Sequence, residues 1–101
     1  VRRYRAETAG ISVGGTSIST GRDSQFLISS VALSALQNES YSCYWKASDG
    51  RFIQLAAQQI LAIAGAVRDH VQACFDREAE LLAHLEAGTY EDSMLDQGWP
   101  A

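Results

Sequence analysis

The chain has 101 residues, of which 47% are hydrophobic and 20% charged, and its net charge is −4 at pH 7. This size and composition are typical of one globular domain and exclude a disordered chain or an array of domains. Two cysteines are too few for a disulfide framework, and no apolar run reaches the roughly 18 residues of a membrane span. We expect a single domain over residues 1–101 in a reducing cytoplasm. Because it begins at Val1 without a methionine, we expect it to be the C-terminal part of a longer protein, with a chain whose first residues are disordered as the alternative.

Charge is distributed unevenly along the chain. Residues 1–22 contain four arginines and one acid, whereas residues 69–101 contain eight acids and one arginine. Because an acidic region repels phosphate, nucleic-acid binding would depend on Arg2, Arg3 and Arg5 alone. We keep nucleic-acid binding as a weak alternative.

The segment ISVGGTSIS predicts a first β-hairpin. Paired glycines accept the positive φ angles of a two-residue turn, which would place Val13 opposite Thr16 and Ile11 opposite Ile18. Glycine pairs can also bind phosphate, but that function needs a helix N-terminus next, and a strand follows here.

A helix is predicted from about Gln25 to Gln37. Asp23 and Ser24 can cap its start. Leu27, Val31 and Ala35 recur at four-residue spacing and give the helix a broad apolar face.

The segment YSCYWKASDGRFIQL predicts a second hairpin with two possible registers. A two-residue loop would mix polar and apolar side chains on both faces. A three-residue loop that ends at Gly50 pairs Trp45 with Ile53 and Cys43 with Leu55, which makes one face apolar. We favour this register, because glycine suits the left-handed position that closes such a turn.

A long helix is predicted from about Ala56 to Glu86, with Gly88 as the stop signal. Thirty residues span about 45 Å, so the helix should extend beyond a domain whose radius of gyration is about 13 Å. Apolar residues recur every seven positions at Ile60, Val67, Cys74 and Leu81, with Ala64, Val71 and Leu85 on the neighbouring row. This spacing is typical of a coiled-coil seam, and packing against the chain's own sheet is the alternative.

The C-terminal region predicts a short last helix. Thr89 resembles a cap for a helix that runs to about Asp96, and Pro100 bars further helix. We expect Trp99 to fold back onto the long helix, with an exposed docking residue as the alternative.

The order of these elements, ββαββα with a short terminal helix, predicts an α+β fold. Two hairpins would form one four-stranded antiparallel sheet, packed against the middle helix and the long C-terminal helix.

Candidate catalytic groups are few. His70 and Cys74 stand four apart on the long helix, but a zinc site needs three or four ligands and a reactive thiol needs an electropositive setting. We predict no catalytic residue, no metal site and no cofactor. The rival hypothesis is an enzymatic or ligand-binding pocket beside Trp45 that uses Asp49 or the His70–Cys74 pair.

Several motifs together resemble a known family. They are the opening RRYRAETAGI, the Gly-Gly hairpin, Trp45-Lys46 followed by Asp49-Gly50, the helical H-V-x-A-C-F and E-x2-L-L, and the final GWP. Together they resemble a domain-of-unknown-function family of phages and prophages, typically the C-terminal part of tail or tail-fibre-associated proteins. The long helix with its Trp-Pro ending is also similar to tail-fibre assembly proteins. The resemblance implies a structural or assembly role and supplies no catalytic motif.

We therefore predict a non-enzymatic, phage tail-associated domain that binds a tail or tail-fibre protein, or a second copy of itself. No membrane partner is expected. The expected location is the bacterial host cytoplasm during assembly, or the virion tail. The candidate interaction surface comprises Val67, Val71, Cys74, Leu81, Leu85 and Trp99.

Overall fold

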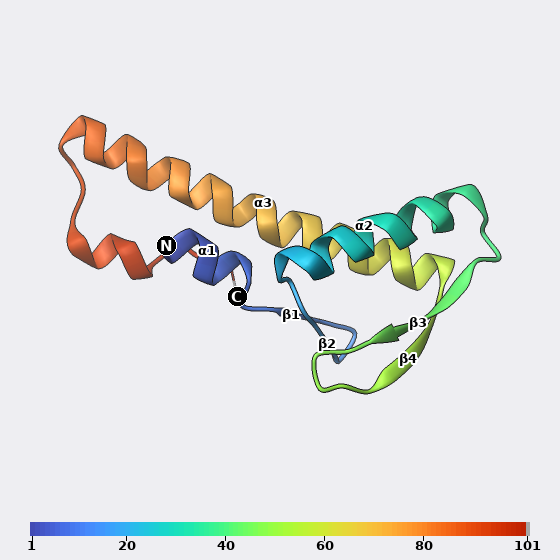
Figure 1. The fold of residues 1–101 in the computed structure, drawn as a ribbon. Coiled ribbons are helices and arrows are strands. Elements are labelled where there is room, and N and C mark those ends of the chain that lie inside the picture. The colour runs from blue at the N-terminus through green and yellow to red at the C-terminus, as the bar shows by residue number, and fades with distance from the viewer. Residues whose placement is uncertain (101) are drawn as a thin grey trace.

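A computed structural model describes residues 1–100 of the chain. The fold is mixed α+β, with two antiparallel strand pairs and a long C-terminal helix (Figure 1). In chain order the elements are α1 (Arg2–Glu7), β1 (Ile11–Val13), β2 (Thr16–Ile18), α2 (Arg22–Gln37), β3 (Ser42–Lys46), β4 (Phe52–Ala56), α3 (Ala57–Ala87) and a 3-10 helix η1 (Asp92–Asp96).

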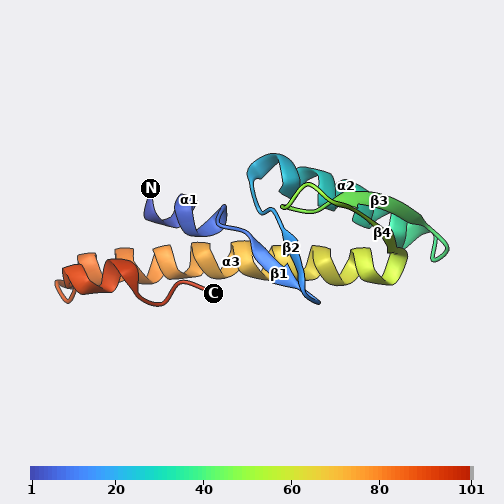
Figure 2. The same ribbon diagram turned by 90° about the horizontal axis from the view of Figure 1, so that it is seen from below.

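Helix α3 is the axis of the molecule. Helix α2 packs along its first half, and α1 packs along its second half (Figures 1 and 2). The radius of gyration is 16.0 Å and the extents are 52 × 27 × 21 Å, compared with about 13 Å for a compact chain of this length. The expected overhang of the long helix is confirmed.

The predicted four-stranded sheet is wrong, because β1–β2 and β3–β4 form two separate two-stranded sheets. The two hairpins meet through the loop after β3, where the Ser48 N–H donates to the carbonyl of Ser17 over 3.0 Å. β1 and β2 are only three residues long, so they offer a short edge for further pairing.

Both predicted hairpin registers are confirmed. Ile11 pairs with Ile18 across the Gly14-Gly15 turn, and Trp45 pairs with Ile53 as the three-residue loop requires. In that loop Gly50 has φ +87°, and Asp49 Oδ1 accepts the N–H of Arg51 over 3.0 Å. The turn therefore sets the register.

The main core lies where α2, α3 and both hairpins meet. Its buried members are Ile18, Ile28, Ala35, Leu55, Ala57, Ile60, Ile63 and Val67. Trp45 and Ile53 pack against this cluster from the second hairpin. The apolar face that the register creates is thus buried against the two helices.

The first two helices differ from the predictions. The basic N-terminal segment forms helix α1, which the sequence reading missed. Helix α2 begins at Arg22, so Asp23 and Ser24 lie inside its first turn and Gly21 precedes it without a side-chain cap.

Thr89 does not cap a C-terminal helix. Its N–H instead donates to the carbonyl of His84 over 2.9 Å, next to Gly88 at φ +74°. This arrangement closes the last turn of α3, and the predicted short helix is the 3-10 turn η1.

Candidate interaction surface

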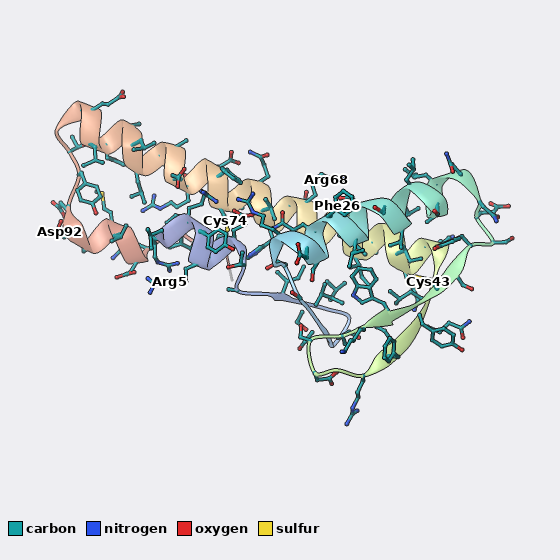
Figure 3. All side chains as sticks on the ribbon, in the orientation of Figure 1. Arg5, Phe26, Cys43, Arg68, Cys74 and Asp92 are labelled. Carbon is teal, nitrogen blue, oxygen red and sulfur yellow. The ribbon has the colours of Figure 1, made fainter. Side chains whose placement is uncertain are left out.

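Helix α1 is held on α3 by a buried polar contact. His70 Nε2 lies 2.9 Å from the carbonyl oxygen of Ala6. A carbonyl can only accept, so the His70 ring donates here. His70 and Ala6 are both buried, and Figure 3 shows Cys74 between α1 and α3. The predicted seam is therefore filled at this level by the chain's own N-terminus.

Glu7 is the centre of a charged cluster that joins α1 to α2. Its side chain is fully buried and forms ion pairs with Arg3 and Arg22. Arg22 Nη2 donates to one carboxylate oxygen and Gln25 Nε2 to the other, each over 2.9 Å. Burial raises the pKa of Glu7, but the hydrogen bonds and charges of Gln25, Arg22 and Arg3 together hold that pKa below its usual value.

The N-terminal arginines bind within the chain rather than facing solvent as a group. Arg2 Nε lies 3.1 Å from Asp96, and its guanidinium lies over the Trp99 ring at 5.0 Å. Arg3 also pairs with Glu78 over 3.0 Å. Arg5 alone of the three is exposed, and Figure 3 shows it on the side of α1 that faces away from α3.

The segment after α3 folds back along the helix, as predicted. Arg77 donates to the carbonyls of Gln97 and Met94, over 2.8 and 3.1 Å. Trp99 Nε1 donates to the carbonyl of Leu95 over 2.7 Å. Polar contacts from one arginine therefore position much of the segment.

A partly apolar groove remains between this segment and the second half of α3. We call it the α3 groove, and its volume is about 310 Å³. Its walls are Val1, Arg2, Arg3, Glu78, Leu81, Leu82, Leu85, Tyr90, Leu95 and Trp99. Leu82, Leu85 and Leu95 are 54%, 55% and 42% exposed.

The six predicted surface residues do not form one exposed seam. Val67 and Cys74 are buried inside the monomer, and Val71 is half-buried against the main core. Leu81, Leu85 and Trp99 come together in the α3 groove, where Leu81 forms the floor and Leu85 is exposed. We therefore remove Val67 and Cys74 from the candidate surface.

His70 and Cys74 form a close pair, with 3.9 Å between Nε2 and Sγ. Burial and the negative charge of Glu7 raise the pKa of the Cys74 thiol, and burial raises that of Cys43. Raised values make both thiols poor nucleophiles at neutral pH. Within residues 1–100, no three metal-ligating side chains come together.

Asp49, the acid of the rival hypothesis, lies in the hairpin turn. It accepts the Arg51 N–H over 3.0 Å, and its side chain is 58% exposed. Trp45 packs on the main core. Turn geometry and packing account for both residues without a pocket.

Sequence reading missed the roles of Glu7, Arg77 and Tyr90. Glu7 had a usable signal, because it is the only acid among the four arginines of residues 1–22. Arg77 had a similar one, as the only base in residues 69–101. Glu7 does pair with the distant Arg22, whereas Arg77 forms its long-range contacts with the carbonyls of Met94 and Gln97.

None of the helices described in residues 1–100 combines the length and apolarity needed to cross a membrane. A family profile described as a domain of unknown function (DUF4376) matches residues 1–97, nearly the whole chain.

The chain belongs to the DUF4376 family. No curated protein and no solved structure shows a significant match to it. The DUF4376 match covers α1, both hairpins, the two long helices and η1, so the α3 groove lies within the family domain except for Trp99.

Proposed function

We propose that this DUF4376 domain is a non-enzymatic, phage tail-associated interaction module. It binds a tail or tail-fibre protein, or a second copy of itself, through the second half of α3 and Trp99. It acts in the bacterial host cytoplasm during assembly. It remains on the virion tail if its complex with the tail protein is incorporated there.

One observation carries the binding role: the overhanging half of α3 keeps apolar side chains exposed around a groove. Leu82 and Leu85 are more than half exposed, although both lie on the longest element of the fold. Grouped apolar side chains on a surface mark interaction sites more often than isolated ones do.

The chemistry of the titratable groups supports a non-enzymatic role. The groups with shifted pKa values are Glu7, Cys43 and Cys74. Hydrogen bonds from Gln25 and Arg22, together with the charges of Arg22 and Arg3, explain the lowered pKa of Glu7, and burial is the main cause of the raised pKa values of the thiols. Shifted pKa values often mark catalytic groups when those groups can also reach substrate, but Glu7 and Cys74 are fully buried.

The phage setting is supported by the motifs RRYRAETAGI, H-V-x-A-C-F and the final GWP, which resemble the tail-associated family. Its test is co-expression of the full-length protein with the tail-fibre product encoded beside it, followed by affinity purification. We expect a stoichiometric complex from the wild type and a much weaker one from Leu85→Asp. Absence of any complex with that product would contradict the proposal.

A further inference from the structure

We propose that the α3 groove binds a basic amphipathic helix of a partner protein. The ligand presents leucine-like side chains on one face and lysines or arginines beside them. This inference rests on the proposed function and names the chemistry of its partner.

The apolar part of the groove fits the side chains of a helix. Leu82 and Leu85 stand three residues apart on one face of α3. Leu95 and Trp99 line the groove from the segment after α3, and Leu81, which is buried, lines it from the helix. A volume of about 310 Å³ is at the lower end of ligand pockets, which run from about 300 to 1,000 Å³. It suits a few anchoring side chains, as in helix-in-groove recognition.

Acidic residues near the groove favour positively charged side chains on either side of the apolar face of the ligand. Glu78 lines the groove, and Glu86, Glu91 and Asp96 directly follow its lining residues Leu85, Tyr90 and Leu95 in sequence, so these acids lie on the two segments that form the groove, α3 and the chain after it. Among residues 1–100, neither Glu86 nor Glu91 takes part in an ion pair. Both carboxylates are exposed, so they are available to a cationic partner.

The two guanidiniums at the groove do not reverse this charge. Arg2 is paired with Asp96, and Arg3 is paired with both Glu7 and Glu78. Their charge is therefore already compensated within the chain. The surrounding segments, residues 69–101, contain eight acids and one arginine, and this excess of negative charge favours lysine or arginine in a ligand.

The same charges disfavour a second copy as the occupant. A two-fold dimer places the same patch on both subunits, so it would bring these acidic rims together. Like charges across an interface are unfavourable. Arg5, the exposed arginine of α1, would give a second copy only one positive charge to place against these acids. A basic segment of another protein would neutralise more of them.

Calorimetry with two synthetic helical peptides tests the inference on the full chain. Both peptides carry leucines at positions i, i+3, i+7 and i+10, and the other positions are mostly lysine in one and glutamate in the other. We expect the lysine peptide to bind about tenfold or more tightly than the glutamate peptide, with an affinity that falls as salt rises. Equal affinity for both peptides would overturn the inference.

Paired variants place the binding site. Leu85→Asp should weaken binding of the lysine peptide about tenfold or more. Leu36→Asp is the matched control, because Leu36 is 71% exposed on α2, outside the groove. Circular dichroism checks that both variants fold. Equal loss in both variants would contradict the groove as the site.

Charge reversal separates this inference from the proposed function. Glu86→Lys combined with Glu91→Lys should weaken the lysine peptide and strengthen the glutamate peptide. If this double variant captures the tail-fibre product as well as the wild type does, the inference fails and the proposed function stands. If the wild type binds the lysine peptide as expected but never the tail-fibre product, the phage setting fails and the groove inference stands. A dimer that Leu85→Asp dissociates would identify a second copy as the occupant and overturn the inference.

Discussion

Glu7 is the residue on which the joining of three helices depends. Its carboxylate accepts hydrogen bonds from Arg22 and Gln25 of α2. Beside it on α1, the Ala6 carbonyl accepts a hydrogen bond from His70 of α3. Thr20 completes the junction, because its hydroxyl donates to the Glu7 carbonyl over 2.7 Å and accepts the Gly10 N–H over 2.9 Å. A buried carboxylate is stable only when its oxygens are satisfied in this way.

Removing this charge should destabilise the fold. Glu7→Gln keeps the shape but leaves Arg3 and Arg22 without their shared anion. Because Arg22 is half exposed, solvent offsets part of the loss, and we expect the free energy of unfolding to fall by about 1–3 kcal/mol. Urea denaturation measures it. Glu86→Gln serves as the control, because Glu86 is exposed and forms no ion pair within residues 1–100, and it should change stability by less than about 0.5 kcal/mol.

The same carboxyl should make stability depend on pH. In the folded state its pKa lies below the usual 4.5, so folding favours the ionised form. Glu7 therefore contributes stability above about pH 4.5, and this contribution is lost as pH falls through the folded pKa. We expect the difference in unfolding free energy between the wild type and Glu7→Gln to shrink progressively below pH 4.5. A difference that stays constant down to pH 2.5 would contradict this role.

At the scale of elements, the β3–β4 hairpin shows how a turn fixes what is buried. Side chains alternate between the two faces of a strand, so a shift by one residue would turn Trp45 away from the helices. Gly50, at φ +87°, allows the three-residue loop that prevents this shift. The turn thus decides which face of the hairpin covers the core.

Gly50→Ala should strain that turn. The Cβ added by alanine would meet no atom within 4 Å, so the loss of stability comes from the positive φ angle alone. We expect the free energy of unfolding to fall by about 1–2 kcal/mol. Gly65→Ala is the matched control. Gly65 lies inside α3, where the added methyl would come no closer than 3.8 Å to Arg68 Nη2. There alanine should stabilise the protein by about 0.5–1 kcal/mol. Thermal denaturation of the two variants should shift the midpoint in opposite directions.

At the scale of the whole molecule, α3 makes the protein elongated. The helix spans 31 residues and the core covers its first half, while α1 and the C-terminal segment cover part of the second. Their contacts there include arginine–carboxylate pairs, which leave the leucines between them exposed. The elongated shape and the exposed leucines therefore both result from the second half of α3 extending beyond the main core.

Small-angle scattering with light scattering checks both the shape and the self-association alternative. We expect a monomer of 11.0 kDa with a radius of gyration close to 16 Å. A value near 13 Å would mean that the helix does not overhang. A concentration-dependent doubling of mass would favour the second copy as partner.

The sequence by itself determined the local structure of this DUF4376 domain. The Gly14-Gly15 pair and Gly50 fixed both hairpin turns, and alternating side chains fixed the register that pairs Trp45 with Ile53. Periodicity and Gly88 fixed the long helix to within one residue at each end. These features depend on backbone angles and on spacing along the chain, which the sequence contains.

Only the tertiary structure decided which parts pack together. The heptad row of α3 predicted a seam for a partner, yet Val67 is covered by the chain's own core and Cys74 lies beneath α1. Helix α1 is too short to be stable alone, and its contacts with Glu78 and His70 lie more than 60 residues away. The two hairpins form separate sheets because each packs on the helices instead of pairing with the other. Apolar spacing shows that a face must be buried, and the contacts between distant segments decide what buries it.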